Sequence, residues 1–265
     1  MTQIGESIAV SIGSQAAEAT SPCWFCEEED PGKELFNNEV ADPDTSDAEP
    51  AELVPENDEH NDSSELGTNL GNKPVWQIAN PLNETKSTEV LPGAHHCIPG
   101  GASLAKATDL HKFMRKSEDY YSDIGYNVND KKNGVWLPGN YAVRADAKEF
   151  NMTTWSAQSA DFKAKYVEYA VQQSGGRQFH DAHRAYNRLA KKSLLALASK
   201  LKLPEDEICP ICEKKKETKN KPPFGLVRKL HFISGEYRNM LKSPTKQTVN
   251  AGFYTSSKMK KLFPK

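Results

Sequence analysis

Two pairs of histidines give this chain the residues for metal-assisted chemistry. His95 and His96 are adjacent, and His180 and His183 form an H-x-x-H pair. A neutral imidazole is a nitrogen ligand for divalent metals, and an ordinary pKa near neutrality lets the same group accept a proton. Hydrolysis of a phosphodiester uses both a Lewis acid and a general base. The two pairs therefore predict a hydrolytic site with one metal ion.

The spacing within each pair suggests how the roles are divided. Successive strand residues point to opposite sides, so His95 and His96 can do different jobs at a strand edge. His180 and His183, near a predicted helix start, would project from one helical face and complete the coordination of the ion. A base must also be held in one tautomer, and Asn133 is a candidate for that role. Asn133 precedes Gly134, however, and this pair is also typical of an ordinary turn.

Three short motifs, taken in order, resemble one nuclease family. They are Ala94-His95-His96, Asn133-Gly134-Val135-Trp136-Leu137-Pro138, and His180-x-x-His183-x-x-Tyr186-Asn187. Together they resemble the AHH group of the HNH/endonuclease VII nucleases, over roughly residues 90–190. The resemblance implies a ββα-metal core, in which a β-hairpin holds a metal ion and one following helix supplies ligands.

The resemblance also implies a role for each residue. His96 would be the general base that activates water, and His95 would bind the metal with His183 and His180. Asn133 would orient the base or lie near the metal. The last histidine pair is spaced more closely than is common in the family, and the segment between Asn133 and His180 is longer than a minimal core.

Members of this group are common among bacterial polymorphic toxins, including effectors of contact-dependent and type VI secretion systems. By that resemblance we expect a metal-dependent endonuclease that hydrolyses phosphodiester bonds of nucleic acid, with DNA rather than RNA as the expected substrate. The catalytic ion would be Mg²⁺, Mn²⁺ or Zn²⁺. The expected partners are nucleic acid, a cognate immunity protein and a secretion-system carrier.

The elements that must position these residues are predicted from patterning. A short strand ending in a turn is expected over 91–99, and an apolar segment follows the turn signal at 133–134. Helical spacing is found at 103–114, at 154–172 and most clearly at 183–201, where Pro204 ends the helix. The predicted fold class is α+β: an HNH-like core with helical insertions.

Composition divides the chain into four segments. Residues 1–26 hold one cysteine pair, and 27–73 form an acidic segment too polar to offset its chain entropy, which predicts a disordered linker. Order is expected to begin at Pro74-Val75-Trp76. The nuclease domain is predicted over 74–203 and a basic extension over 204–265. The acidic segment could instead lie on the basic extension and restrain it.

Two C-x-x-C pairs each place two thiolates on one edge of a tetrahedron. The first pair is Cys23 and Cys26, and the second pair is Cys209 and Cys212. Together they predict a structural Zn²⁺ site of the Cys₄ type that staples the N-terminus to the extension. A redox dithiol is the competing interpretation of the first pair. Cys97 is left over, and we expect it to be buried beside the histidines.

Charge is distributed unevenly. Residues 27–65 carry sixteen acidic side chains against Lys33, whereas 184–265 carry twenty lysines and arginines against six acidic residues. The basic end suits a polyanion, because each neutralised phosphate releases counterions. A solvated lysine-rich surface is the alternative, and the interleaved aromatics could stack on bases or form a core. The predicted nucleic-acid contacts are Arg177, Arg184, Lys214, Lys215 and Lys216.

Other features bound the setting and the alternatives. No apolar run reaches the length of a membrane span, and the N-terminus lacks a signal-peptide pattern. We therefore expect synthesis in the cytoplasm and delivery without a cleavable signal. The main alternative function is a zinc-stabilised nucleic-acid-binding or adaptor protein without catalysis. A third is a metallohydrolase acting on small phosphoesters.

Overall fold

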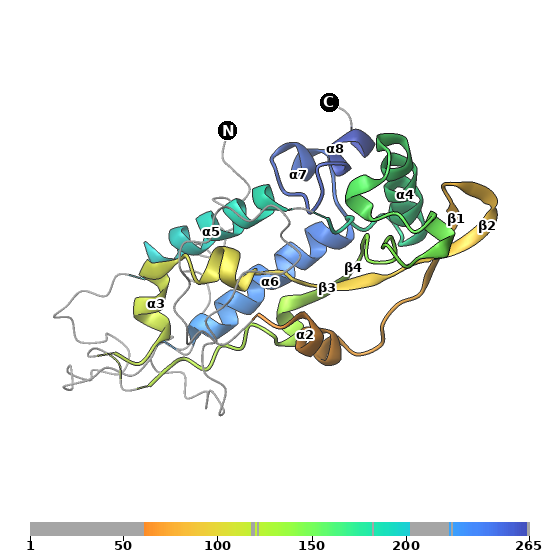
Figure 1. Ribbon diagram of the computed structural model, residues 1–265. Helices are drawn as coiled ribbons and strands as arrows, with labels where there is room; N and C mark the ends of the chain where they lie inside the picture. The colour runs from red at the N-terminus through yellow and green to blue at the C-terminus, as the bar shows by residue number, and fades with distance from the viewer. Residues whose placement is uncertain are drawn as a thin grey trace.

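The computed structural model describes residues 61–117, 120, 122–181, 183–201, 223 and 225–263. This part combines helices with two small antiparallel sheets, which confirms the predicted α+β class. Figure 1 shows the arrangement of the elements.

The predicted zinc site lies outside the described residues. None of its four ligands, Cys23, Cys26, Cys209 and Cys212, belongs to the part of the chain that the structure describes. The same holds for three of the predicted nucleic-acid contacts, Lys214, Lys215 and Lys216. The Cys₄ site and these lysine contacts therefore stay predictions from the sequence.

The described part begins with α2 (Ser63–Leu70), β1 (Trp76–Asn80), β2 (Asn83–Val90), β3 (Pro92–His96), the π-helix η1 (Gly100–Leu104) and α3 (Thr108–Met114). It continues with the 3₁₀ turn η2 (Lys131–Asn133), β4 (Gly134–Pro138) and the 3₁₀ turns η3 (Lys148–Phe150) and η4 (Trp155–Ala157). The remaining helices are α4 (Ala160–Gln173), α5 (Arg184–Ala198), α6 (Gly225–Lys242), α7 (Lys246–Asn250) and α8 (Met259–Leu262).

The sheet that carries the first histidine pair is formed by β3 and β4. The two strands are antiparallel, with Pro92 opposite Pro138 and His96 opposite Gly134. The intervening residues, 97–133, leave the sheet and return, so the strands are not joined by a tight turn. Asn133 ends η2 immediately before β4. The Asn133–Gly134 pair therefore marks the start of a strand.

The helix α2 corrects the predicted linker. Residues 27–73 were expected to be disordered, but Ser63–Leu70 is helical and order reaches back at least to residue 61. Asp62 caps the helix by accepting hydrogen bonds from the backbone N–H groups of Ser64 and Glu65. Leu66 is fully buried against Gly134. The sequence prediction missed this helix because the acidic composition of the whole segment was given more weight than the Asp62 cap and the apolar Leu66.

We call the antiparallel β3–β4 pair the β3–β4 hairpin, although residues 97–133 separate its strands along the chain. Helix α2 lies against this hairpin, as Figure 1 shows. Gly67 faces Ala94 and the ring of Trp136, where an added Cβ would lie 3.2 Å from the ring. Because side chains alternate along a strand, His96 belongs to the same face of β3 as Ala94, and His95 belongs to the opposite face. The α2 side and the α5 side of the hairpin thus receive different histidines.

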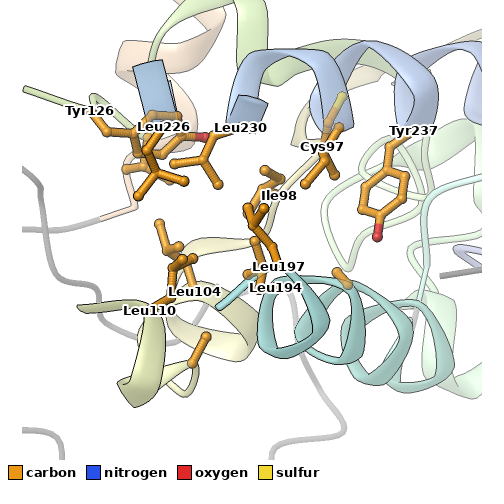
Figure 2. Close-up of a cluster of buried hydrophobic side chains, with 14 of the residues drawn as sticks. Cys97, Ile98, Leu104, Leu110, Tyr126, Leu194, Leu197, Leu226, Leu230 and Tyr237 are labelled. Carbon is orange, nitrogen blue, oxygen red and sulfur yellow. The ribbon is translucent and has the colours of Figure 1, made fainter. Parts of the chain in front are cut away.

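Helices α3, α5 and α6 pack around Cys97 and Ile98, which directly follow β3. Figure 2 shows these side chains between α5 and α6, with Leu194, Leu197, Leu230 and Tyr237. Ile98 is fully buried. Truncation of such a side chain to alanine typically costs roughly 2–5 kcal/mol, so this cluster holds α5 firmly beside β3.

The predicted helices are largely confirmed. The pattern at 183–201 corresponds to α5, and that at 154–172 corresponds to η4 and then α4, which Ser159 caps by accepting from Phe162 N–H. The pattern at 103–114 is split between η1 and α3. Within the described residues, no helix combines the length and apolarity needed to cross a bilayer.

The C-terminal aromatics divide between the two interpretations weighed for them. Tyr237 and Phe253 are buried and pack on Tyr186 of α5, with ring centroids 6.0 and 4.9 Å away. Phe232, in contrast, is 41% exposed on α6. The basic region is therefore partly a folded extension whose aromatics belong to the core.

Candidate metal centre

Three histidines from separate elements converge in the interior. His95 comes from β3, His180 pairs with Gly139 in an isolated bridge, and His183 is the residue directly before α5. One ligand nitrogen of each lies within 4.8 Å of the others, and each residue is at most 2% exposed. The ring centroids are 4.8 to 5.1 Å apart. A single ion can be shared by such a triangle.

His180 reaches this cluster by a route that the sequence prediction missed. It was expected to project with His183 from one helical face, but it lies before α5 and outside any helix. Its backbone N–H donates to the carbonyl of Pro138 over 2.7 Å, at the end of β4. His180 and His183 thus reach the cluster from different surroundings, one beside the end of β4 and the other at the start of α5.

Two side chains orient the rings through Nδ1. Tyr141 Oη lies 2.5 Å from His180 Nδ1, and Asn187 Oδ1 lies 2.9 Å from His183 Nδ1. The Asn187 oxygen accepts, so His183 Nδ1 carries the proton. With Nδ1 of each ring held in this way, Nε2 is the nitrogen that each would offer to an ion.

Gly93 and Gly139 make room for the Tyr141 ring. A Cβ at either position would come within 2.6 Å of a ring carbon. These glycines therefore permit the close approach of Tyr141 to the sheet, which the hydrogen bond to His180 requires. Tyr141 was missed by the sequence argument, and no spacing or motif marked it.

The pKa of His95 is strongly perturbed by its surroundings. Burial is the largest cause that lowers its pKa well below the ordinary value of 6.5, and the nearby rings of His180, His183 and His96 lower it further. The ring is therefore neutral at physiological pH, which is the form that binds metals. Both of its nitrogens are buried, and neither has a hydrogen-bond partner among the residues that the structure describes. A cation at the centre of the triangle would satisfy one of them, so the donor set fits a bound metal.

His96 lies on the other face of β3, outside the group of three. Its Nε2 is 2.9 Å from Asn129 Oδ1, and the residue is 3% exposed. It is still close enough to His95 to contribute to the lowered pKa of that ring. The two adjacent histidines therefore lie in different surroundings.

The side-chain amide of Asn133 is hydrogen-bonded to the scaffold. Its Oδ1 accepts from the backbone N–H of Ile98 and from the hydroxyl of Ser234, and its Nδ2 donates to the carbonyls of Ile98 and Val128. All of its amide hydrogen-bonding capacity is used within the scaffold. These contacts include neither His96 nor the three clustered histidines, and the amide that lies beside His96 belongs to Asn129.

The region around His180 is also held by the C-terminal residues. Asp181 forms an ion pair with Lys258 at 2.5 Å, and both side chains are largely buried. The backbone N–H of Thr255 donates to the amide oxygen Oε1 of Gln178 over 2.8 Å. The segment that carries His180 is therefore fixed from two sides, by β4 and by residues 255–258.

The remaining predicted residues that the structure describes lie in different surroundings. Arg177 is partly buried and donates through Nη1 to the carbonyl of Trp136, while Arg184 is exposed at the start of α5. Their contact with nucleic acid stays a prediction. Cys97 is fully buried, as expected, and burial is the main cause that raises the pKa of its thiol to about 12.

Comparisons of the chain with protein-family models, with curated proteins and with solved structures find no match.

Proposed function

We propose that this protein is a metal-dependent endonuclease that hydrolyses phosphodiester bonds of nucleic acid, with DNA as the proposed substrate. The observation that carries the proposal is the buried triangle of His95, His180 and His183, with ligand atoms within 4.8 Å of one another. The triangle is built on a two-stranded hairpin and the N-terminus of a following helix. This order of parts supports a ββα-metal site of the HNH type, extended by the insertion between β4 and α5.

In this proposal the residues divide the work between ion and base. A divalent cation held by the three imidazoles would neutralise negative charge on the scissile phosphate. His96 accepts a proton from the attacking water. Asn187 Oδ1 accepts from His183 Nδ1 and Tyr141 Oη engages His180 Nδ1, so that both rings present Nε2 to the ion. Mg²⁺, Mn²⁺ and Zn²⁺ are the candidates, and three nitrogen ligands favour Zn²⁺ or another transition ion over Mg²⁺.

The burial of the three ligands favours a second candidate function. Structural metal sites are closed, whereas catalytic sites keep a position open to water or substrate. Because each ligand is at most 2% exposed, the ion could instead stabilise a nucleic-acid-binding or adaptor protein that has no catalytic activity. The two functions make opposite predictions for cleavage and the same prediction for metal binding.

A plasmid-nicking assay separates them. We expect the full chain to nick supercoiled DNA with Mg²⁺, Mn²⁺ or Zn²⁺, and His96→Ala to lower the rate by about 10²-fold or more, the loss typical of a general base. His96→Ala should still bind the ion, whereas His183→Ala should lose it. His111→Ala is the matched control, because His111 bonds to the carbonyl of Leu104 outside the triangle and should leave nicking within about twofold.

The biological setting is tested in the same pair of proteins. As an antibacterial toxin, delivered by a secretion-system carrier and restrained by an immunity protein, wild-type protein should fragment chromosomal DNA when expressed in bacteria. The His96→Ala variant should not. Metal binding and DNA binding with no cleavage under any of the three ions would support the adaptor, and turnover of small phosphoesters with intact DNA would support another metallohydrolase.

A further inference from the structure

A chain of hydrogen bonds links His96 to helix α2. His96 Nε2 meets Asn129 Oδ1 at 2.9 Å, and Asn129 Nδ2 donates to Glu65 Oε2 at 2.7 Å. Asn129 is fully buried and lies in the turn before η2, whereas Glu65 is on the exposed side of α2. None of the three motifs discussed above includes Asn129 or Glu65.

The partners of Asn129 determine which way its amide points. The backbone N–H of Asp62 can only donate, and it donates to Oδ1 over 3.0 Å. The carboxylate of Glu65 accepts from Nδ2. The oxygen and the nitrogen of the amide are therefore assigned by groups with a single possible role, without reference to the histidine.

This assignment fixes the tautomer of His96. Because Oδ1 can only accept, His96 Nε2 must carry the proton and donate it to Asn129. In the neutral ring Nδ1 is then the nitrogen that carries the lone pair. A general base has to present an unprotonated nitrogen to water, so the tautomer decides which edge of the ring is able to do so.

We infer that Asn129 is the positioning residue of the general base, and that Glu65 of α2 holds the Asn129 amide in the orientation that makes Nδ1 of His96 the basic nitrogen. This inference rests on the proposed function, since it assigns a role to neighbours of the proposed base. It also gives α2 a function: the helix delivers Asp62 N–H and the Glu65 carboxylate to a turn more than sixty residues further along the chain.

Two measurements on the full chain test the inference. The first is the tautomer of His96, read from long-range ¹⁵N–¹H correlations of histidine-labelled protein. We expect a protonated Nε2 in the wild type, and loss of that single tautomer in Asn129→Ala. A wild-type ring protonated at Nδ1 would overturn the inference, whether or not the protein cleaves DNA.

The second measurement is the kinetics of nicking. Asn129→Ala and Glu65→Ala should each lower kcat by about tenfold or more while KM for DNA changes less than about twofold, because neither residue is placed to bind substrate. Glu65→Gln should recover most of kcat, because the amide oxygen of glutamine still accepts from Asn129 Nδ2.

Asn69 offers the matched control. Its side-chain Nδ2 donates to the carbonyl oxygen of Asn129 over 2.9 Å, so it ties α2 to the same turn without contacting the Asn129 amide. Asn69→Ala should leave both kcat and the His96 tautomer unchanged. Equal losses of kcat in Asn69→Ala and Glu65→Ala would show that α2 acts only by tethering the turn, and this would overturn the positioning role. An inactive wild type with the expected tautomer would reject the nuclease proposal and leave the hydrogen-bond assignment standing.

Discussion

At the scale of single residues, this site depends on which nitrogen of each imidazole faces the ion or the water. His183 and His180 have Nδ1 engaged by Asn187 and Tyr141, and His96 has Nε2 engaged by Asn129. Two of the three proposed ligands, His180 and His183, and the proposed base are thus held through opposite nitrogens. Chemically identical side chains acquire different roles from the neighbours that hold them.

The lowered pKa of His95 predicts a pH dependence of stability for the metal-free protein. In the unfolded chain the ring protonates near its ordinary pKa of 6.5, but in the folded chain it stays neutral to lower pH. Above about pH 6.5 the ring is neutral in both states, so its protonation does not affect stability. As pH falls from there toward the folded pKa, the free energy of unfolding decreases by about 1.4 kcal/mol per pH unit.

Urea unfolding of chelator-treated protein at about pH 7.5 and about pH 5.5, on either side of the ordinary histidine pKa, measures this loss. His95→Gln has no titrating ring, so its stability should fall less between the two pH values than that of the wild type. Equal slopes for the two proteins would mean that burial of His95 does not control its protonation.

At the scale of elements, the β3–β4 hairpin is the part that brings the site together. It carries His95, its β4 end holds His180 through the Pro138 carbonyl, and Gly93 and Gly139 admit Tyr141. The opposite face receives α2. We therefore expect a change of backbone shape in the hairpin to disturb the proposed ligands more than it disturbs the core around Ile98.

Gly139→Ala tests this dependence. The new methyl group would overlap the ring of Tyr141, so the ring must move, and overpacking of this kind typically costs about 1–3 kcal/mol. We expect weaker metal binding by isothermal titration, together with a lower free energy of unfolding.

Gly235→Ala in α6 is the control for this substitution. No atom of the described residues lies within 4 Å of the added Cβ there, so the change should raise stability by about 0.5–1 kcal/mol and leave metal binding unchanged. Similar effects of the two substitutions on metal affinity would contradict the role given to Tyr141.

At the scale of the whole molecule, the proposed centre brings together parts of the chain that are far apart in the sequence. One ion bound to the triangle would link the hairpin, the end of the β4–α5 insertion and helix α5. Such a link stabilises the folded state by mass action, by about 2.7 kcal/mol when the free metal is at about 100 times its Kd.

Thermal unfolding with and without metal checks this expectation. For a chain of this size the gain corresponds to a rise in Tm of roughly 5–10 °C with Zn²⁺ in excess over a chelated sample. His183→Ala should show no such rise. A wild type whose Tm does not respond to Zn²⁺, Mn²⁺ or Mg²⁺ would remove the metal centre and the functions proposed for it.

The sequence was sufficient to predict those parts of the site that depend on local pattern. The periodicity at 183–201 predicted α5, and the two histidine pairs predicted the residues of the triangle. It was not sufficient for Asn129, Tyr141 or the contacts of Asn133, because their hydrogen bonds join residues far apart along the chain and depend on how the elements pack. The helix at 63–70 was missed because a segment-wide acidic composition outweighed the Asp62 cap and the Leu66 anchor.

The order in which the three ligands occur along the chain has a consequence during translation. His95 is made long before His180 and His183, and Lys258, which fixes Asp181 beside His180, is made later still. A nascent chain that ends before residue 183 has an incomplete ligand set, however well its hairpin has formed. A ribosome that stalls between β4 and α5 therefore releases a fragment that lacks part of the proposed ligand set. The complete set exists only after the ribosome has passed the start of α5.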